Sequence, residues 1–91
     1  MPSIEYYEAL RSDIVRLLRE ERERQKLSKY VVAKRSGVSQ SMLSLVERGL
    51  RNPTLELTLR IADGIGADLA DIIQKAQANI SKKSGEKSKG V

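Results

Sequence analysis

The chain has 91 residues, of which 40% are hydrophobic and 32% are charged, and its formal net charge is +5. This length predicts one small domain near the lower limit for burying an adequate core, so association of two copies would help it. Cysteine and histidine are absent, which excludes disulfides, zinc-finger ligation, cysteine nucleophiles and histidine bases. With no long apolar run and no signal-peptide pattern, the sequence predicts a cytoplasmic protein without a metal ion, a cofactor or a membrane partner.

The first predicted element is one long helix over residues 4–26, which contain no internal Gly or Pro. Apolar residues recur in it at a spacing close to 3.6 positions, namely Ile4, Tyr7, Leu10, Ile14, Leu17 and Leu18. Ser12 and Asp13 could instead cap a separate helix that starts at Ile14. Residues 1–12 are therefore interpreted as a helical extension that continues into the first helix of the domain or precedes it.

Two short helices joined by a glycine turn are predicted next, over residues 29–36 and 40–48. Serine is predicted to cap the start of each helix, because its hydroxyl accepts an unpaired backbone N–H, and glycine to allow the turn after each. These residues are Ser28, Gly37, Ser39 and Gly49. Helices this short and this closely joined must cross steeply, which is the helix-turn-helix arrangement that offers its second helix to a DNA groove.

The two faces of this unit carry different residue types. The positions predicted to face inward are Val32, Ala33, Gly37, Val38, Leu43 and Val46. On the other face of the second helix, Gln40, Ser41 and Ser44 carry groups that hydrogen-bond base edges, although Gln40 and Ser41 also suit the first turn of any helix. Leu45 is expected to face outward, where it would either contact a thymine methyl group or pack on the loop at residues 50–53.

Positive charge is concentrated on the same part of the chain. Residues 22–53 carry eight Lys or Arg against two Glu, a net charge of +6, whereas residues 1–21 and 54–80 each carry −2. A surface that faces phosphates would show this segregation, and a generic solvated surface would not be expected to.

The last third of the chain predicts two more helices and a tail. Thr54 is predicted to cap a fourth helix that ends near Gly66, with a weak point at Gly64 and a buried side formed by Leu55, Leu59, Ile61 and Ala62. Asp68 is predicted to cap a fifth helix that ends near Asn79 and buries Leu69, Ile72 and Ile73. Residues 81–91, SKKSGEKSKGV, are rich in Lys and Ser and predict a disordered basic tail.

From Leu18 to Ile73 the chain resembles the Cro/repressor-type helix-turn-helix domain of the Xre family of bacterial and phage regulators. The resemblance is carried by Arg22, LSKYVVAKRSGVSQSMLSLVERG at residues 27–49, Pro53 and LRIADGIGADLADII at residues 59–73. It implies an all-α, compact five-helix lambda-repressor-like domain, here over residues 13–80. It also implies a transcriptional regulator, expected to be a repressor, that binds a palindromic operator in double-stranded DNA as a homodimer.

The resemblance also implies roles for individual residues. Base contacts are expected from Gln40, Ser41, Ser44 and Leu45, and phosphate contacts from Lys29, Arg51 and Asn52. Lys29 stands where a glutamine is typical, so a charged contact would replace a neutral one. Lys34 and Arg35 are interpreted as general electrostatic contacts to phosphate. Arg22 and Glu47 match the interhelical ion pair of the family, whereas composition alone favours an ordinary surface arginine at residue 22.

Two other function classes are alternatives to the regulator. An antitoxin would use the same fold and hold a protein toxin with the tail or the N-terminal extension. An enzyme is disfavoured because the carboxylates lie on charged helix faces with no convergent nucleophile or base. No sensor domain is evident, so the sequence predicts no small-molecule ligand.

Overall fold

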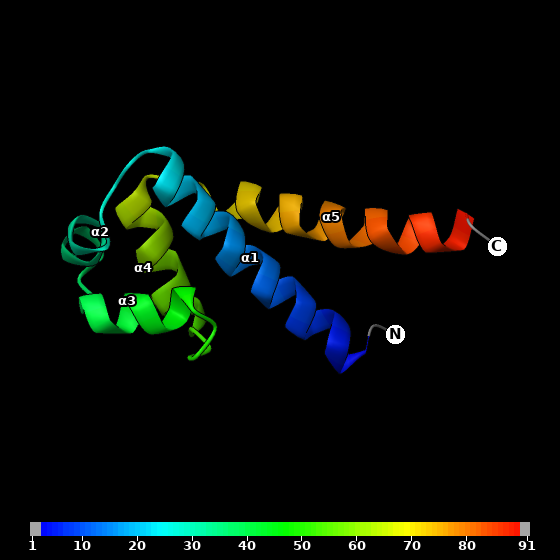
Figure 1. The fold of residues 1–91 in the computed structure, drawn as a ribbon, viewed down its shortest axis with the longest axis horizontal. Helices are drawn as coiled ribbons and strands as arrows, with labels where there is room; N and C mark the ends of the chain where they lie inside the picture. Colours follow the sequence, from blue (N-terminus) through cyan, green and yellow to red (C-terminus); the bar gives the residue numbers. More distant parts are fainter. Residues whose placement is uncertain (1–2, 90–91) are drawn as a thin grey trace.

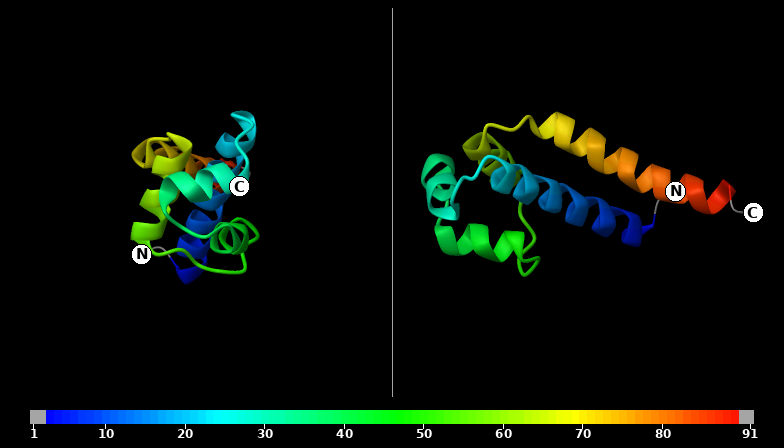
Figure 2. Two further views of the ribbon diagram at one scale, coloured as in Figure 1. Left: turned by 90° about the vertical axis from the view of Figure 1, so that its left-hand side faces the viewer. Right: turned by 45° about the horizontal axis from the view of Figure 1, so that its top comes forward.

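The computed structural model describes the backbone of residues 3–89 and the side chains of residues 3–82. Five helices and no strands make up this part of the chain, which confirms the all-α prediction: α1 (Ile4–Arg24), α2 (Lys29–Ser36), α3 (Gln40–Glu47), α4 (Leu55–Ile65) and α5 (Leu69–Lys89). The three shorter helices gather at one end of the molecule, and α1 and α5 run from there toward the other end (Figures 1 and 2).

The first helix is continuous, so residues 4–12 extend it rather than form a separate element. Ser3 caps its start by accepting a hydrogen bond from the Tyr6 amide at 3.2 Å, and no break occurs at Ser12. The helix ends at Arg24. Lys26 follows in the left-handed region with φ +58°, which turns the chain toward α2.

The helix-turn-helix unit has the predicted caps. The Ser28 and Ser39 hydroxyls accept the amides of Val31 and Met42 at 3.1 and 3.0 Å. Gly37 ends α2 with φ +73°, a conformation that costs a residue with a Cβ atom more than glycine. Gly37 is exposed, so its predicted inward position is wrong, because a residue in the turn lies outside the contact between the helices.

The core lies where α1, α2, α3 and α4 meet and continues along α5. Its buried apolar residues are Leu18, Val32, Ala33, Leu43, Val46, Ile61, Ala62, Ile65, Leu69, Ile72 and Ala76. Gly64 is also buried, and a Cβ atom there would lie 2.9 Å from the Val32 carbonyl oxygen. Gly64 therefore permits the close approach of α2 and α4, a role that the sequence did not indicate.

Two residues of the predicted buried side of α4 are exposed. Leu55 is 71% exposed and Leu59 is 50% exposed. Leu59 lies about 200° around the helix from buried Ile61, since each residue turns an α-helix by about 100°. Leu55 occupies the first turn. Apolar residues occur on both sides of α4, and only the side that carries Ile61, Ala62 and Ile65 meets the core.

The last helix is longer than expected. It extends to Lys89 instead of ending near Asn79, and so continues through most of the segment predicted to be disordered. Serine, lysine and glutamate are compatible with a helix, and no proline interrupts residues 80–89. The disorder of residues 81–91 stays a prediction. None of the helices within residues 3–89 is long and apolar enough to cross a membrane.

Candidate nucleic-acid interface

One face of α3 is free of the core and carries the residues predicted to read bases. Gln40 and Ser41 are exposed in its first turn, and Ser44 and Leu45 are half-buried one turn later. The opposite face holds the helix in place through Leu43 and Val46, which are buried in the core cluster. The structure therefore presents hydroxyl and amide groups on a well-anchored helix, while the contacts of these residues with DNA stay predictions.

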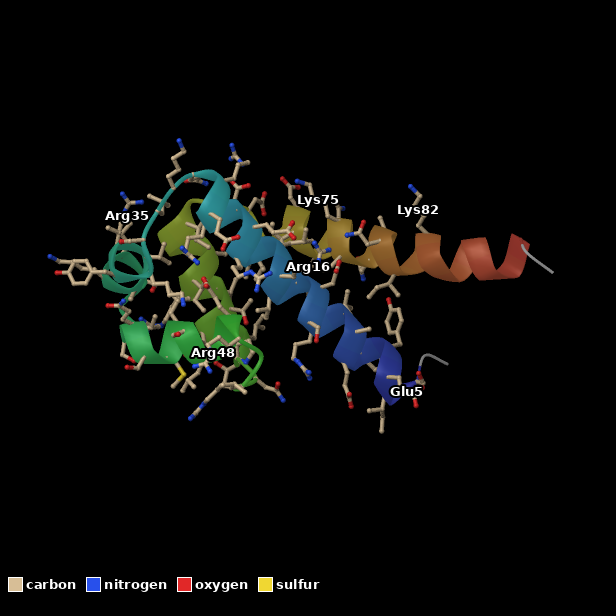
Figure 3. All side chains as sticks on the ribbon, in the orientation of Figure 1. Glu5, Arg16, Arg35, Arg48, Lys75 and Lys82 are labelled. Atoms are coloured by element: carbon tan, nitrogen blue, oxygen red, sulfur yellow. The ribbon has the colours of Figure 1, made fainter. Side chains whose placement is uncertain are left out.

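The basic residues of α2 differ in how close they lie to this face of α3. The Lys29 Nζ atom is 3.3 Å from the Ser44 hydroxyl, so this residue adjoins α3 directly. Lys34 lies 5.8 Å from the centroid of the exposed Tyr30 ring, and Arg35 is exposed. Figure 3 shows Arg35 on α2, well away from Arg48 at the end of α3. The positive charge thus extends beyond the reading helix.

A bidentate ion pair joins α1 to the end of α3. The Arg22 Nε and Nη2 atoms donate to the two carboxylate oxygens of Glu47 at 2.7 and 2.9 Å, and Arg22 Nη1 donates to the Leu27 carbonyl at 2.9 Å. Hydrogen bonding to Glu47 raises the pKa of Arg22 above its ordinary value. The residues predicted to pair are therefore in contact, and the pair sets the position of α3 relative to α1.

The loop after α3 contributes the other predicted phosphate contacts. Leu50 donates its amide to the Leu45 carbonyl at 2.9 Å, which folds the loop back on the helix after Gly49. Arg51 and Asn52, which follow, are exposed. Both residues line two hollows, one of about 420 Å³ beside the start of α3 and one of about 290 Å³ beside α1.

Arg48 is a basic residue of this face to which sequence reasoning assigned no contact. It is exposed directly after α3, at the C-cap. Its position is four residues after Ser44 and eight after Gln40, so the three residues share one stripe of the helix. This spacing was the signal that could have identified it.

The described side chains contain no group of three or more Asp, Glu, His or Cys that could hold a metal ion. Apart from the hollows beside the loop, the larger depressions lie between α1, α4 and α5 and at the α4–α5 turn.

The model of a family described as a helix-turn-helix domain matches residues 13–72. A search of curated proteins gave no significant match. Among solved structures, the chain is similar to the clp gene regulator ClgR from Corynebacterium glutamicum, with 26% identity, a TM-score of 0.71 and coverage of 89% of this chain and 86% of that one.

Two further similar structures are restriction-modification controller proteins. C.AhdI from Aeromonas hydrophila is 32% identical, with a TM-score of 0.63 and coverage of 72% of this chain and 98% of that one. A mutant of C.Esp1396I is 20% identical, with a TM-score of 0.73 and coverage of 80% and 95%, and this likeness concerns the fold alone.

Proposed function

The chain belongs to the helix-turn-helix family, and we propose that it is a DNA-binding transcriptional regulator that binds a palindromic operator as a homodimer and acts as a repressor. The family assignment rests on the match over residues 13–72. The similarity to a gene regulator and to a restriction-modification controller protein favours a regulatory role. We propose that the chain is not an enzyme. A cytoplasmic location stays a prediction.

The observation that carries this proposal is the exposed polar face of α3. In this arrangement the N-terminal residues of the second helix enter the major groove. Gln40 and Ser41 are exposed there, and their side chains can hydrogen-bond to base edges. Lys29, Arg51 and the amides at the helix starts would contact phosphates and set the register of the protein on the duplex.

The homodimer is supported by an apolar surface between α1, α4 and α5. A hollow of about 220 Å³ there is lined mainly by apolar residues, including Tyr7, Leu10, Leu55 and Ile73. Tyr7 is 56% exposed and Leu55 is 71% exposed. Exposed apolar residues that cluster in this way mark interaction sites, and a second copy of the chain would cover them.

The dimer is tested by sedimentation of two matched variants. Leu55→Lys places a charge in the hollow and is expected to shift the protein toward a monomer. Leu59→Lys makes the same change on α4, but Leu59 does not line this hollow. Equal effects of the two substitutions, or none, would argue against this dimer face.

The central experiment is a binding titration at several salt concentrations, with random-sequence duplex and with the DNA upstream of the gene for this protein. Wild-type protein is expected to prefer the upstream DNA. The double variant Gln40→Ala/Ser41→Ala is expected to lose that preference and keep the weak binding to random DNA, since phosphate contacts carry no sequence information. The matched control is Gln74→Ala/Gln77→Ala, which changes exposed residues of α5. Equal affinity for both DNAs would contradict the proposal for this promoter.

The alternative function is an antitoxin, which would bind a protein toxin as well as its own promoter. The exposed N-terminal turns of α1, where Ile4 is 76% exposed, offer a surface for such a partner. A toxin gene beside this gene, and co-purification of its product with the chain, would favour the antitoxin over the dedicated regulator.

A further inference from the structure

Five arginines surround one hollow beside the end of α3. This hollow of about 290 Å³ lies between the middle of α1 and the loop after α3, and its arginines are Arg11, Arg16, Arg19, Arg48 and Arg51. We call it the arginine pocket. Figure 3 shows Arg16 on α1 and Arg48 at the end of α3, two elements that the fold brings together.

Most of the positive charge in the arginine pocket is unpaired. Arg16 is neutralised by Asp13 and Glu20, which accept from its guanidinium at 2.6 and 2.7 Å. Glu47 is the one carboxylate among the lining residues, and Arg22 already holds both of its oxygens. Within residues 3–82, no ion pair involves the four other arginines of the pocket, Arg11, Arg19, Arg48 and Arg51. Four like charges around one hollow favour an anionic ligand.

Arg19 provides a second indication that the pocket accepts an anion. Its Nε atom is buried and donates to no acceptor in the described part of the protein. Burying an N–H donor without an acceptor is costly, and most buried donors in proteins are paired. Arg19 lines the pocket, and the planar fork of donors of a guanidinium suits phosphate oxygens.

We propose that the arginine pocket binds a phosphodiester group of the DNA backbone. The inference rests on the proposed function and extends its interface from α3 to α1. Arg48 belongs both to the pocket and to the stripe that carries Gln40 and Ser44, so the pocket begins where the reading face ends. The loop residues Arg51 and Asn52 line it as well. This continuity favours a backbone phosphate over a free anion.

The test measures how the affinity for random-sequence duplex depends on salt. The variant Arg19→Gln removes one charge from the α1 side of the pocket and leaves the hollow of the proposed dimer face unchanged, whereas Arg11 lines both hollows. Loss of one phosphate contact lowers the magnitude of the slope of log K against log[salt] by about 0.9, and several-fold weaker binding is expected at low salt. The ratio of affinities for upstream and random DNA should not change, since phosphate contacts are insensitive to sequence.

The matched control is Arg24→Gln, which removes the same charge from an exposed residue outside the pocket. Arg48→Gln leaves α1 unchanged and is also expected to lower the slope, so a folding defect in α1 cannot explain both results. If the pocket variants and the control have equal slopes while Gln40→Ala/Ser41→Ala still abolishes the preference, the pocket inference fails and the proposed function stands.

Two further outcomes separate the proposed function from the pocket inference, and a DNA phosphate from a free anion. If wild-type protein shows no preference for upstream DNA, the proposed regulator at that promoter fails, and a reduced slope of the pocket variants on random duplex still supports the phosphate contact. Inorganic phosphate, titrated without DNA, provides the second arm. If it shifts the NMR signal of the Arg19 Nε–H group while the DNA slope is unchanged in the variants, the ligand is a free anion and the assignment to DNA is overturned.

Discussion

Arg22 and Arg24 lie two residues apart on α1 and carry the same kind of ion pair in two different regions of the molecule. Arg22 faces α3, and its side chain and that of its partner Glu47 are only 10% and 6% exposed. Arg24 faces solvent with a side chain that is 70% exposed, and it pairs with Glu21 on the preceding turn of the same helix. In both cases hydrogen bonding to the carboxylate raises the pKa of the arginine.

This difference shows that burial and sequence separation decide how much such an ion pair contributes to the stability of the fold. The Arg22 pair joins two helices and leaves a buried charge if either partner is lost, which is strongly unfavourable. The Arg24 pair is screened by water and connects residues that the helix already holds together, so little is expected of it. The inner region of the molecule should therefore be sensitive to substitution and the outer region tolerant.

The largest predicted effect is that of Arg22→Ala. It leaves Glu47 buried without its partner and removes the hydrogen bond to the Leu27 carbonyl, so a loss of about 3–5 kcal/mol of unfolding free energy is expected. Arg24→Ala is the matched control, and little loss of stability is expected from it because water screens this exposed pair. Urea unfolding of the two variants measures the difference.

A double substitution separates the unpaired charge from the packing. Arg22→Met/Glu47→Leu removes both charges and keeps apolar bulk, and it should recover most of the stability lost in Arg22→Ala, because no buried charge is left without a partner. If Arg22→Ala and Arg24→Ala unfold at the same urea concentration, the contrast between the two regions is wrong.

The second prediction concerns Gly64, where α4 approaches α2. An alanine Cβ there would lie 2.9 Å from the Val32 carbonyl oxygen, a backbone atom that cannot turn aside. We expect Gly64→Ala to destabilise the fold by about 1–3 kcal/mol through overpacking, although alanine in a helix is otherwise favoured over glycine by about 1 kcal/mol. Thermal unfolding measures the sum, and a more stable variant would show that the helices can move apart without cost.

The sequence predicted the parts of the fold that rest on local signals. Ser28 and Ser39 start α2 and α3, and Gly37 ends α2, because caps and left-handed turns require few residue types. The pairing of Arg22 with Glu47 spans 25 residues, and the family resemblance, not composition, favoured it.

The features that the sequence did not predict depend on which helix surfaces contact one another in the fold. The apolar residues of α4 occur on both sides, so the sequence could not show that Leu55 and Leu59 stay exposed. The sequence marks Gly64 only as a weak point of the helix, because the carbonyl that it approaches, that of Val32, belongs to another helix. The arginine pocket was missed for the same reason, since its α1 residues and its loop residues are joined only by the fold.

The third prediction tests a local backbone contact at an exposed site. Ser39→Ala removes the hydroxyl that accepts the Met42 amide, and the loss of such a cap costs about 1 kcal/mol. Ser41→Ala changes a neighbouring exposed serine that caps no helix, and its effect is expected within about 0.5 kcal/mol. Chemical denaturation of both variants compares them. Equal stabilities would show that the cap contributes nothing measurable to α3.

The smallest predicted effect is the pH dependence of the ion pair between Arg24 and Glu21. Hydrogen bonds from Arg24 and then Gln25 lower the pKa of Glu21 from its ordinary value of 4.5 to about 2. A depressed carboxylate pKa contributes stability above pH 4.5 that is lost as the pH falls toward 2. For this largely exposed pair the contribution is small, because water screens the two charges. The difference in unfolding free energy between wild type and Arg24→Ala should thus be constant above pH 4.5 and vanish near pH 2. A difference that persists at pH 2 would mean that Arg24 stabilises α1 through its packing or its place in the last helical turn, and not through the charge of Glu21.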